Sequence, residues 1–220
     1  MARETKKVRR EAARQARVEA DRRRRQMRRR RRIVGASLAG VVALVGIVAG
    51  LQRLARTRIN VAKEARAAGC SEIRELPDQG RKHLEAGEAP PTYNSNPPTS
   101  GPHAIDPAPW GSYDGLVPAE IAVHNLEHGG TVIRYNNKLS RTRVKDLTDL
   151  VESYEEPSGV MLFPDPGIDR PLALAAWRRL RTCREFSEPV VRAFIEKFCN
   201  KGPERQQILN CRPPAEGSGS

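Results

Sequence analysis

The four histidines are the residues of this sequence whose types and spacing most clearly predict chemistry. His124 and His128 are four residues apart, so on one turn of helix both rings would lie on the same face, within reach of one ion. His103 lies upstream, in a segment rich in proline and asparagine. Because neutral imidazole suits both zinc and copper, we expect His103, His124 and His128 to bind one copper or zinc ion.

Other side chains near these histidines are candidates to complete the site. His83 adds a fourth imidazole, and Met161 offers a thioether, which is a soft ligand suited to Cu(I). Glu127 and Asn125 lie beside the histidines in sequence and are placed to hydrogen-bond imidazole N–H groups, which would orient the rings. We therefore expect His83 and Met161 as additional ligands, with Glu127 and Asn125 supporting them.

The segment His124–His128 also matches the H-x-x-E-H pattern, in which two histidines hold zinc and the glutamate acts as a base. That chemistry requires a sustained helix, whereas Gly129, Gly130 and a β-branched run follow at once. A zinc-dependent hydrolase using Glu127 is therefore a weaker alternative. The sequence also lacks the G-x-S-x-G pattern and glycine-rich phosphate loops, so we expect binding rather than catalysis.

The same histidines also have a purely structural interpretation. Histidines near the start of a strand serve as hydrogen-bonding groups that lock a loop in place. The domain would then be a structural or interaction module of the cell envelope, with histidines that brace the fold and a prolyl loop that contacts a partner protein. The residue pattern alone leaves this interpretation open beside metal binding.

The four cysteines all follow the apolar run described below. No two of them have the C-x-x-C spacing of a redox motif or a zinc knuckle. In an oxidising compartment an even number of cysteines predicts disulfides rather than metal ligands, and four cysteines allow three connectivities. Among these connectivities we favour Cys70–Cys183 with Cys199–Cys211.

Residues 1–32 form a basic segment with 16 Lys and Arg residues against four acidic residues. The whole chain has a formal net charge of +13, so this segment carries nearly all of the excess. It has no aromatic residue and too few apolar ones to form a core. A basic run can bind nucleic acid, but the apolar run that follows makes anionic lipid the expected partner.

An uncharged apolar run of 19 residues extends from Ile33 to Leu51. As a helix it would span about 28 Å, which matches the hydrocarbon core of a bilayer. We expect residues 33–52 to form a single transmembrane helix, with a cleaved signal peptide as the alternative. The charge bias predicts a cytoplasmic N-terminus and an extracytoplasmic C-terminal domain, and the small residues of the run would allow a homodimer.

Beyond this run we expect a helical stalk at residues 53–69, one extracytoplasmic domain at residues 70–205 and a flexible tail at residues 206–220. The expected fold class is α+β, with a small, mainly antiparallel sheet, two or three helices and a long Pro-rich loop at residues 87–118.

Periodicity gives the expected elements of this domain. Residues 131–135 and 159–163 are expected strands, and residues 141–153 and 188–200 are expected helices. Residues 171–182 alternate but are rich in alanine, and we expect a strand there that carries Trp177.

Several boxes of this sequence resemble a bacterial family known as domain of unknown function 3105. The resemblance covers roughly residues 70–205, and His83 also falls where the family has a histidine. It implies a membrane-anchored or exported protein with this domain outside the membrane, and no reaction. The sequence departs from the family pattern at Ala175 and Arg178, where the family has threonine and glycine. The resembling boxes are YNSNPPTSGPH at 93–103, APWGSY at 108–113, HNLEHGG at 124–130 and PLALAAWRRLRTC at 171–183.

Overall fold

The computed structural model describes residues 19, 22–25, 27, 46–53, 55–85, 87–204 and 208–211. The chain divides into two compact units, Met1–Thr57 and Arg58–Ser220. Most of the expected basic segment, transmembrane helix and C-terminal tail lies outside the described residues. Within the described ranges, no helix combines the length and the apolar character needed to cross a membrane.

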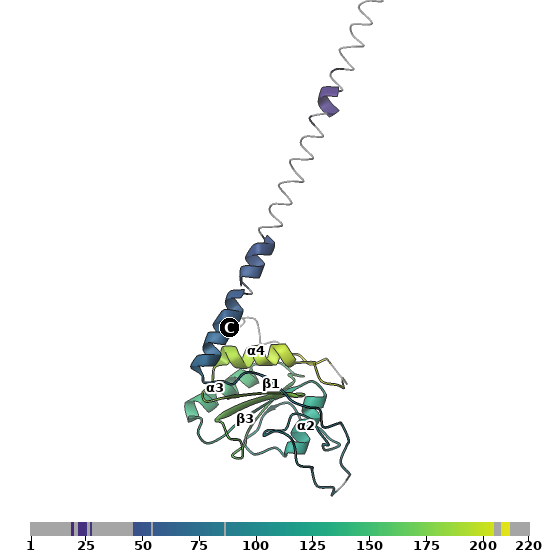
Figure 1. Ribbon diagram of the computed structural model, residues 1–220, viewed down its shortest axis with the longest axis vertical. Coiled ribbons are helices and arrows are strands. Elements are labelled where there is room, and N and C mark those ends of the chain that lie inside the picture. The colour runs from purple at the N-terminus through teal and green to yellow at the C-terminus, as the bar shows by residue number, and fades with distance from the viewer. Residues whose placement is uncertain are drawn as a thin grey trace, which may run out of the picture. The chain divides into compact units, whose positions relative to one another are not determined.

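The second unit (Figure 1) is built on a six-stranded mixed sheet. Its strand order is β1-β6-β5-β3-β4-β2. Strands β3 and β4 pair in parallel, as do β2 and β4, whereas the remaining neighbours are antiparallel. The strands are β1 (Arg74–Glu75), β2 (Gly111–Ser112), β3 (Thr131–Tyr135), β4 (Val160–Pro164), β5 (Leu172–Ala176) and β6 (Arg179–Cys183).

The expectation of a mainly antiparallel sheet is confirmed in part, because the sheet is mixed, with three antiparallel and two parallel pairings. Helix α3 (Arg141–Glu152) lies between β3 and β4 in the chain. A crossover through a helix returns the chain to the same end of the sheet, so the two strands that it joins run in parallel. The expected strands at 131–135 and 159–163 are both present, but their pairing follows from this crossover.

The helices cover the two faces of the sheet. Helices α3 and α4 (Glu188–Phe198) pack in one core cluster with Ile133 of β3, and α2 (Ala119–Glu127) packs in a second cluster with Val132 of the same strand. This division follows from the strand, because successive side chains point to opposite faces. Helices α3 and α4 coincide closely with the expected helices, whereas α2 was not expected as a complete helix.

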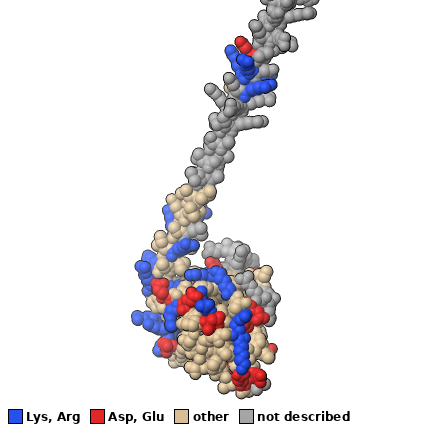
Figure 2. All heavy atoms as spheres, turned by 45° about the vertical axis from the view of Figure 1, so that its right-hand side comes forward, with Lys and Arg blue, Asp and Glu red and all other residues tan. Residues whose placement is uncertain are grey.

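The C-terminal half of the expected stalk belongs to the folded domain. Residues 58–67 are helical and lie in the second unit. Ala65 is buried in the same core cluster as α3 and α4. Acidic and basic side chains are interspersed on the visible face of this unit (Figure 2).

The segment expected as one strand carrying Trp177 is a hairpin of two strands. Strands β5 and β6 pair antiparallel, with Ala176 opposite Arg179. Trp177 and Arg178 form the turn between them, and Arg178 has a φ of 60°. The alternation of apolar residues in this segment was interpreted correctly, but the turn was missed because arginine occupies a position that suits glycine.

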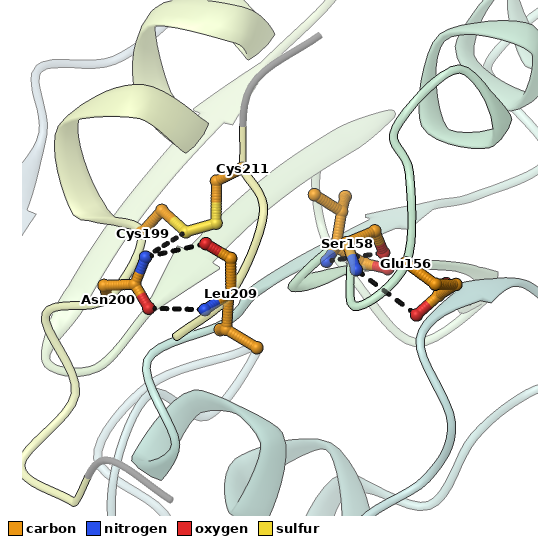
Figure 3. Close-up of a disulfide and its surroundings, with 7 residues drawn as sticks. Glu156, Ser158, Cys199, Asn200, Leu209 and Cys211 are labelled. Atoms are coloured by element: carbon orange, nitrogen blue, oxygen red, sulfur yellow. Dashed lines mark hydrogen bonds between the residues drawn. A yellow bond between two sulfur atoms is a disulfide. The ribbon is translucent and has the colours of Figure 1, made fainter. Parts of the chain in front are cut away.

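All four cysteines are in disulfides, Cys70–Cys183 and Cys199–Cys211. This is the connectivity that we favoured from the sequence. Figure 3 shows the second disulfide beside a pair of hydrogen bonds in which the side-chain amide of Asn200 meets the backbone N–H and carbonyl of Leu209. These contacts hold the segment that follows α4 against the domain.

Candidate metal centre

Helix α2 and its C-terminal turn position three polar side chains of the predicted site. His124 and Glu127 lie in the last turn of α2, and His128 is its C-cap residue. Gly129 follows with a φ of 88°, a conformation that ends helices and favours glycine. A side chain at Gly130 would overlap the ring of Trp110. The two glycines therefore end the helix here and let the chain enter β3 beneath this ring.

The other two histidines come from segments that meet beside α2. His83 and His103 form an isolated parallel β-bridge. The N–H of Leu84 donates to the carbonyl of His103 at 2.8 Å, and the N–H of His103 donates to the carbonyl of Lys82 at 3.0 Å. These bonds fix the relative positions of two rings that are 20 residues apart in the sequence.

The four imidazole rings converge at one place in the fold. The rings of His83 and His124 are stacked, with centroids 5.2 Å apart and an interplanar angle of 8°. His103 lies edge-on to both, with centroid distances of 4.9 Å to His83 and 5.0 Å to His124. His128 lies 4.5 Å from His124. The sequence reasoning required imidazoles from distant segments to meet, and the structure brings them together.

Backbone carbonyls set the orientation of the two most central rings. The Nδ1 of His103 lies 2.8 Å from the carbonyl oxygen of Gly101, and the Nδ1 of His124 lies 2.7 Å from that of Ala104. A carbonyl only accepts hydrogen bonds, so both Nδ1 atoms carry a proton. This arrangement is typical of metal-ligating histidines, because it leaves Nε2 to face the site.

Glu127 places a buried carboxylate among the rings. Its Oε2 lies 3.0 Å from Nε2 of His103 and 3.9 Å from Nε2 of His83. Both ring nitrogens of His103 thus face oxygen atoms that accept hydrogen bonds. We expected Glu127 only as a supporting residue, but its oxygen lies where a ligand would.

The ligand atoms form two groups that share His124. One group joins His83, His103 and His124, and the other joins His124, Glu127 and His128; within each, the ligand atoms lie within 4.8 Å of one another. The set that the sequence favoured, His103 with His124 and His128, is not one of the groups found among the described residues. In the first of these groups His83 takes the place that we gave to His128.

Access to the cluster from solvent is through His83. Its side chain is 45% exposed, whereas that of Glu127 is 2% exposed and that of His103 is fully buried. The Nε2 atoms of His124 and His128 lie 2.6 Å apart, as hydrogen-bonding partners. The Nδ1 of His128 is buried and has no hydrogen-bond partner within the described part of the chain.

Burial lowers the pKa of His124 below its ordinary value of 6.5. The hydrogen bond to the Ala104 carbonyl opposes this effect, and the positive charge that the other three histidines would carry adds to the lowering. A lowered pKa keeps the ring neutral at physiological pH, and neutral imidazole is the form that binds metal ions.

Two candidates from the sequence have other surroundings. Asn125 does not orient an imidazole, which corrects the expectation: its Oδ1 accepts from the N–H of Ala108 at 3.0 Å and its Nδ2 donates to the Ala108 carbonyl at 2.8 Å. This two-point contact fixes the Pro-rich loop to α2. Met161 is fully buried in the apolar cluster with Val123 and Leu126.

Some features of the site had no signal in the sequence. The carbonyls of Gly101 and Ala104 orient the rings, and any residue type supplies a carbonyl. The ring of Trp177 lies edge-on to His103 with a centroid distance of 6.5 Å, and its place in the β5–β6 turn was missed. Their positions depend on the fold rather than on residue types.

Fold and site together define a class of protein: a domain with a mixed sheet, helices on both faces and a buried cluster of histidines and one glutamate. The chain belongs to the family described as protein of unknown function (DUF3105), whose pattern matches residues 85–211, more than half of the chain. The match includes His103, His124, Glu127 and His128, and it begins just after His83. No curated protein and no solved structure matches the chain.

Proposed function

We propose that this domain binds one transition-metal ion, copper or zinc, through His83, His103 and His124, with Glu127 as the fourth group. The observation that carries the proposal is the convergence of three imidazoles from three separate segments into one group of ligand atoms. Oε2 of Glu127 lies 3.0 Å and 3.9 Å from Nε2 of two of these rings, those of His103 and His83. A carboxylate and three imidazoles suit either metal, and the half-exposed His83 gives the ion a route from solvent.

Distances between the side chains favour this ligand set over one that contains both His124 and His128. Two ligands with bonds of about 2.0–2.1 Å to a tetrahedral ion lie about 3.3 Å apart. The distances from Glu127 Oε2 to His103 and His83, 3.0 and 3.9 Å, bracket this value. The 2.6 Å between His124 and His128 is too short for two ligands, so His128 must move aside when His124 binds an ion.

Metal titration of the full-length protein in detergent, first stripped with a chelator, tests the proposal. We expect about one zinc or copper ion per chain by elemental analysis after dialysis. Because an ion that binds only the folded state stabilises it, a hundredfold excess over Kd adds about 2.7 kcal/mol. For a domain of this size that corresponds to a rise of about 5–10 °C in Tm.

His83→Ala is the most informative variant, because its side chain is half-exposed and removing it leaves the buried hydrogen bonds intact. We expect at least tenfold weaker metal binding with an unchanged Tm of the metal-free protein. Glu127→Gln should also weaken binding, and Glu120→Gln, in the first turn of the same helix, is its matched control. Saturation with either metal that leaves Tm unchanged would reject the site.

A structural role for the histidines is the second candidate, and the hydrogen bonds of His103 and His124 to backbone carbonyls support it. In that case His83→Ala would have no effect on metal content, because the protein would bind none. His124→Ala would lower the stability of the metal-free protein and would alter nothing else. The two variants therefore separate bracing of the fold from metal binding.

We also propose that residues 33–52 anchor this domain on the outer side of a membrane. The support is the uncharged run between Arg32 and Arg53 and the basic residues before it. Protease added to intact cells should remove the domain and leave the N-terminal segment protected. Recovery of the whole chain in the soluble fraction would contradict the anchor.

A further inference from the structure

A pocket on the α2 side of the sheet has polar groups that differ in kind from those of the histidine cluster. It has a volume of about 360 Å³. Its walls include Arg134 of β3, Asp165, Tyr93 of the Pro-rich loop, and Leu116 and Val117, which precede α2. None of these residues belongs to the proposed metal site, so the pocket requires its own explanation.

Among the residues that line this pocket, Arg134 is unusual because it is a buried cation and two of its side-chain nitrogens have no hydrogen-bond partner among the described residues. Arg134 is 2% exposed, and its Nη1 donates to Asp165 Oδ2 at 3.0 Å. Its guanidinium also lies 4.9 Å from the ring centre of Phe163. Its Nε and Nη2 are buried and have no hydrogen-bond partner among the residues that the structure describes. Leaving such donors unpaired costs about 1–3 kcal/mol each.

The two unused nitrogens lie on one edge of the guanidinium. The N–H bonds of Nε and Nη2 are parallel, and this edge is a geometry with which arginine binds two oxygens of one carboxylate. Burial lowers the pKa of Arg134, and the hydrogen bond to Asp165 opposes this effect. Arginine remains protonated in proteins, so this edge carries two charged donors. Neighbouring side chains cover both donors in this structure, so a ligand reaches them only when side chains that line the pocket move.

The N-terminus of α2 adds a second preference for negative charge at the same pocket. Val117 and Ala119, which flank the N-cap residue Pro118, both line the pocket. Pro118 provides no side-chain cap, so first-turn N–H groups remain available, and helix N-termini favour anions. Glu120 in the first turn and Asp165 already place negative charge nearby, which favours a ligand with a single charge.

We propose that this pocket binds a monocarboxylate with a short apolar part, its two oxygens accepting from Nε and Nη2 of Arg134. Leu116, Val117 and Pro98 line the pocket and would contact the apolar part. Burial, assisted by Glu120, raises the pKa of Tyr93 to about 12, so this wall stays uncharged at neutral pH. A phosphate would add a second charge beside Asp165 and is disfavoured.

Calorimetric titration of the full-length protein with butyrate at constant ionic strength tests this pocket. Butyramide has the same shape without the charge, and inorganic phosphate has charge without the apolar part. We expect saturable butyrate binding, with butyramide and phosphate at least tenfold weaker. Arg134→Lys keeps the charge but removes the parallel donors, and should weaken butyrate binding at least tenfold.

A second variant keeps the test decisive if Arg134→Lys fails to fold. Leu116 is 59% exposed at the rim of the pocket, so Leu116→Glu should fold normally and repel the ligand, again at least tenfold. Ile208, which is 88% exposed and does not line this pocket, supplies the control Ile208→Glu. Equal affinity for butyramide, no saturable butyrate binding, or full affinity in Leu116→Glu would overturn the proposal.

Discussion

His124 is the residue on which the histidine cluster depends most, because it belongs to both groups of ligand atoms. The sequence indicated its importance through its spacing from His128. Histidine, glutamate and methionine are recognisable as candidate ligands in any sequence, so the list of candidates was available before the fold. Which of them share one ion depends on distances between segments, and the sequence does not contain those distances.

The lowered pKa of His124 predicts how the stability of the metal-free protein depends on pH. In the unfolded chain this ring takes up a proton near pH 6.5, whereas the folded protein resists that protonation. Acidification through this value therefore favours unfolding. We expect the free energy of unfolding to fall between about pH 7 and pH 5, measured by urea denaturation.

His124→Gln is the matched variant for this pH dependence, since a glutamine amide can still donate to the Ala104 carbonyl but does not titrate. Its free energy of unfolding should change less over the same pH range. An equally steep dependence in the variant would assign the effect to other groups.

At the scale of elements, the clearest sequence signals were those of strands β3 and β4 and of helices α3 and α4. Strand β4 is a continuous apolar run, and the other three elements have apolar residues at regular spacing. Helix α3 also has a serine N-cap that accepts from the N–H of Arg143. Helix α2 was missed because it has only nine residues and begins after a proline without a capping side chain. The β5–β6 turn was missed because arginine occupies its left-handed position.

The turn at Arg178 gives a prediction about this hairpin. A φ of 60° is unfavourable for a residue with a side chain, by about 1–2 kcal/mol. Arg178→Gly and Arg178→Ala both remove the contacts to Glu75 and Leu76, but only alanine retains the backbone penalty. We expect the glycine variant to be more stable than the alanine variant by about 1 kcal/mol, measured by chemical denaturation. Equal stabilities of the two variants would show that the backbone at position 178 leaves its positive φ when alanine replaces arginine.

At the scale of the whole molecule, the disulfides and the parallel pairing were the features least accessible from local patterns. The connectivity was favoured among three alternatives, and only the fold brings Cys70 beside Cys183. The parallel pairing of β3 with β4 requires knowledge of where the chain returns after α3. Membrane attachment stays a prediction, since the residues concerned lie largely outside the described ranges.

The two disulfides should differ in their contribution to stability. Cys70 and Cys183 are separated by 113 residues, and Cys199 and Cys211 by 12. Because a longer closed loop restricts the unfolded chain more, the chain-entropy model gives about 4–5 kcal/mol for the first and about 3 kcal/mol for the second. We expect the double variant Cys70→Ser/Cys183→Ser to unfold at a lower urea concentration than Cys199→Ser/Cys211→Ser. The reverse order would contradict the entropic account.

The segment after α4 lies directly behind the last turn of α2. The N–H of Asn200 donates to the Gly129 carbonyl at 2.9 Å, and the N–H of Glu204 donates to the Glu127 carbonyl at 3.2 Å. A side chain at Gly202 would overlap the backbone at Glu127 and Gly129. The turn that bears the ligands is therefore completed by residues synthesised some 70 positions later. During biosynthesis, residues 200–204 must therefore emerge from the ribosome before the turn that carries the proposed ligands can take up its final position.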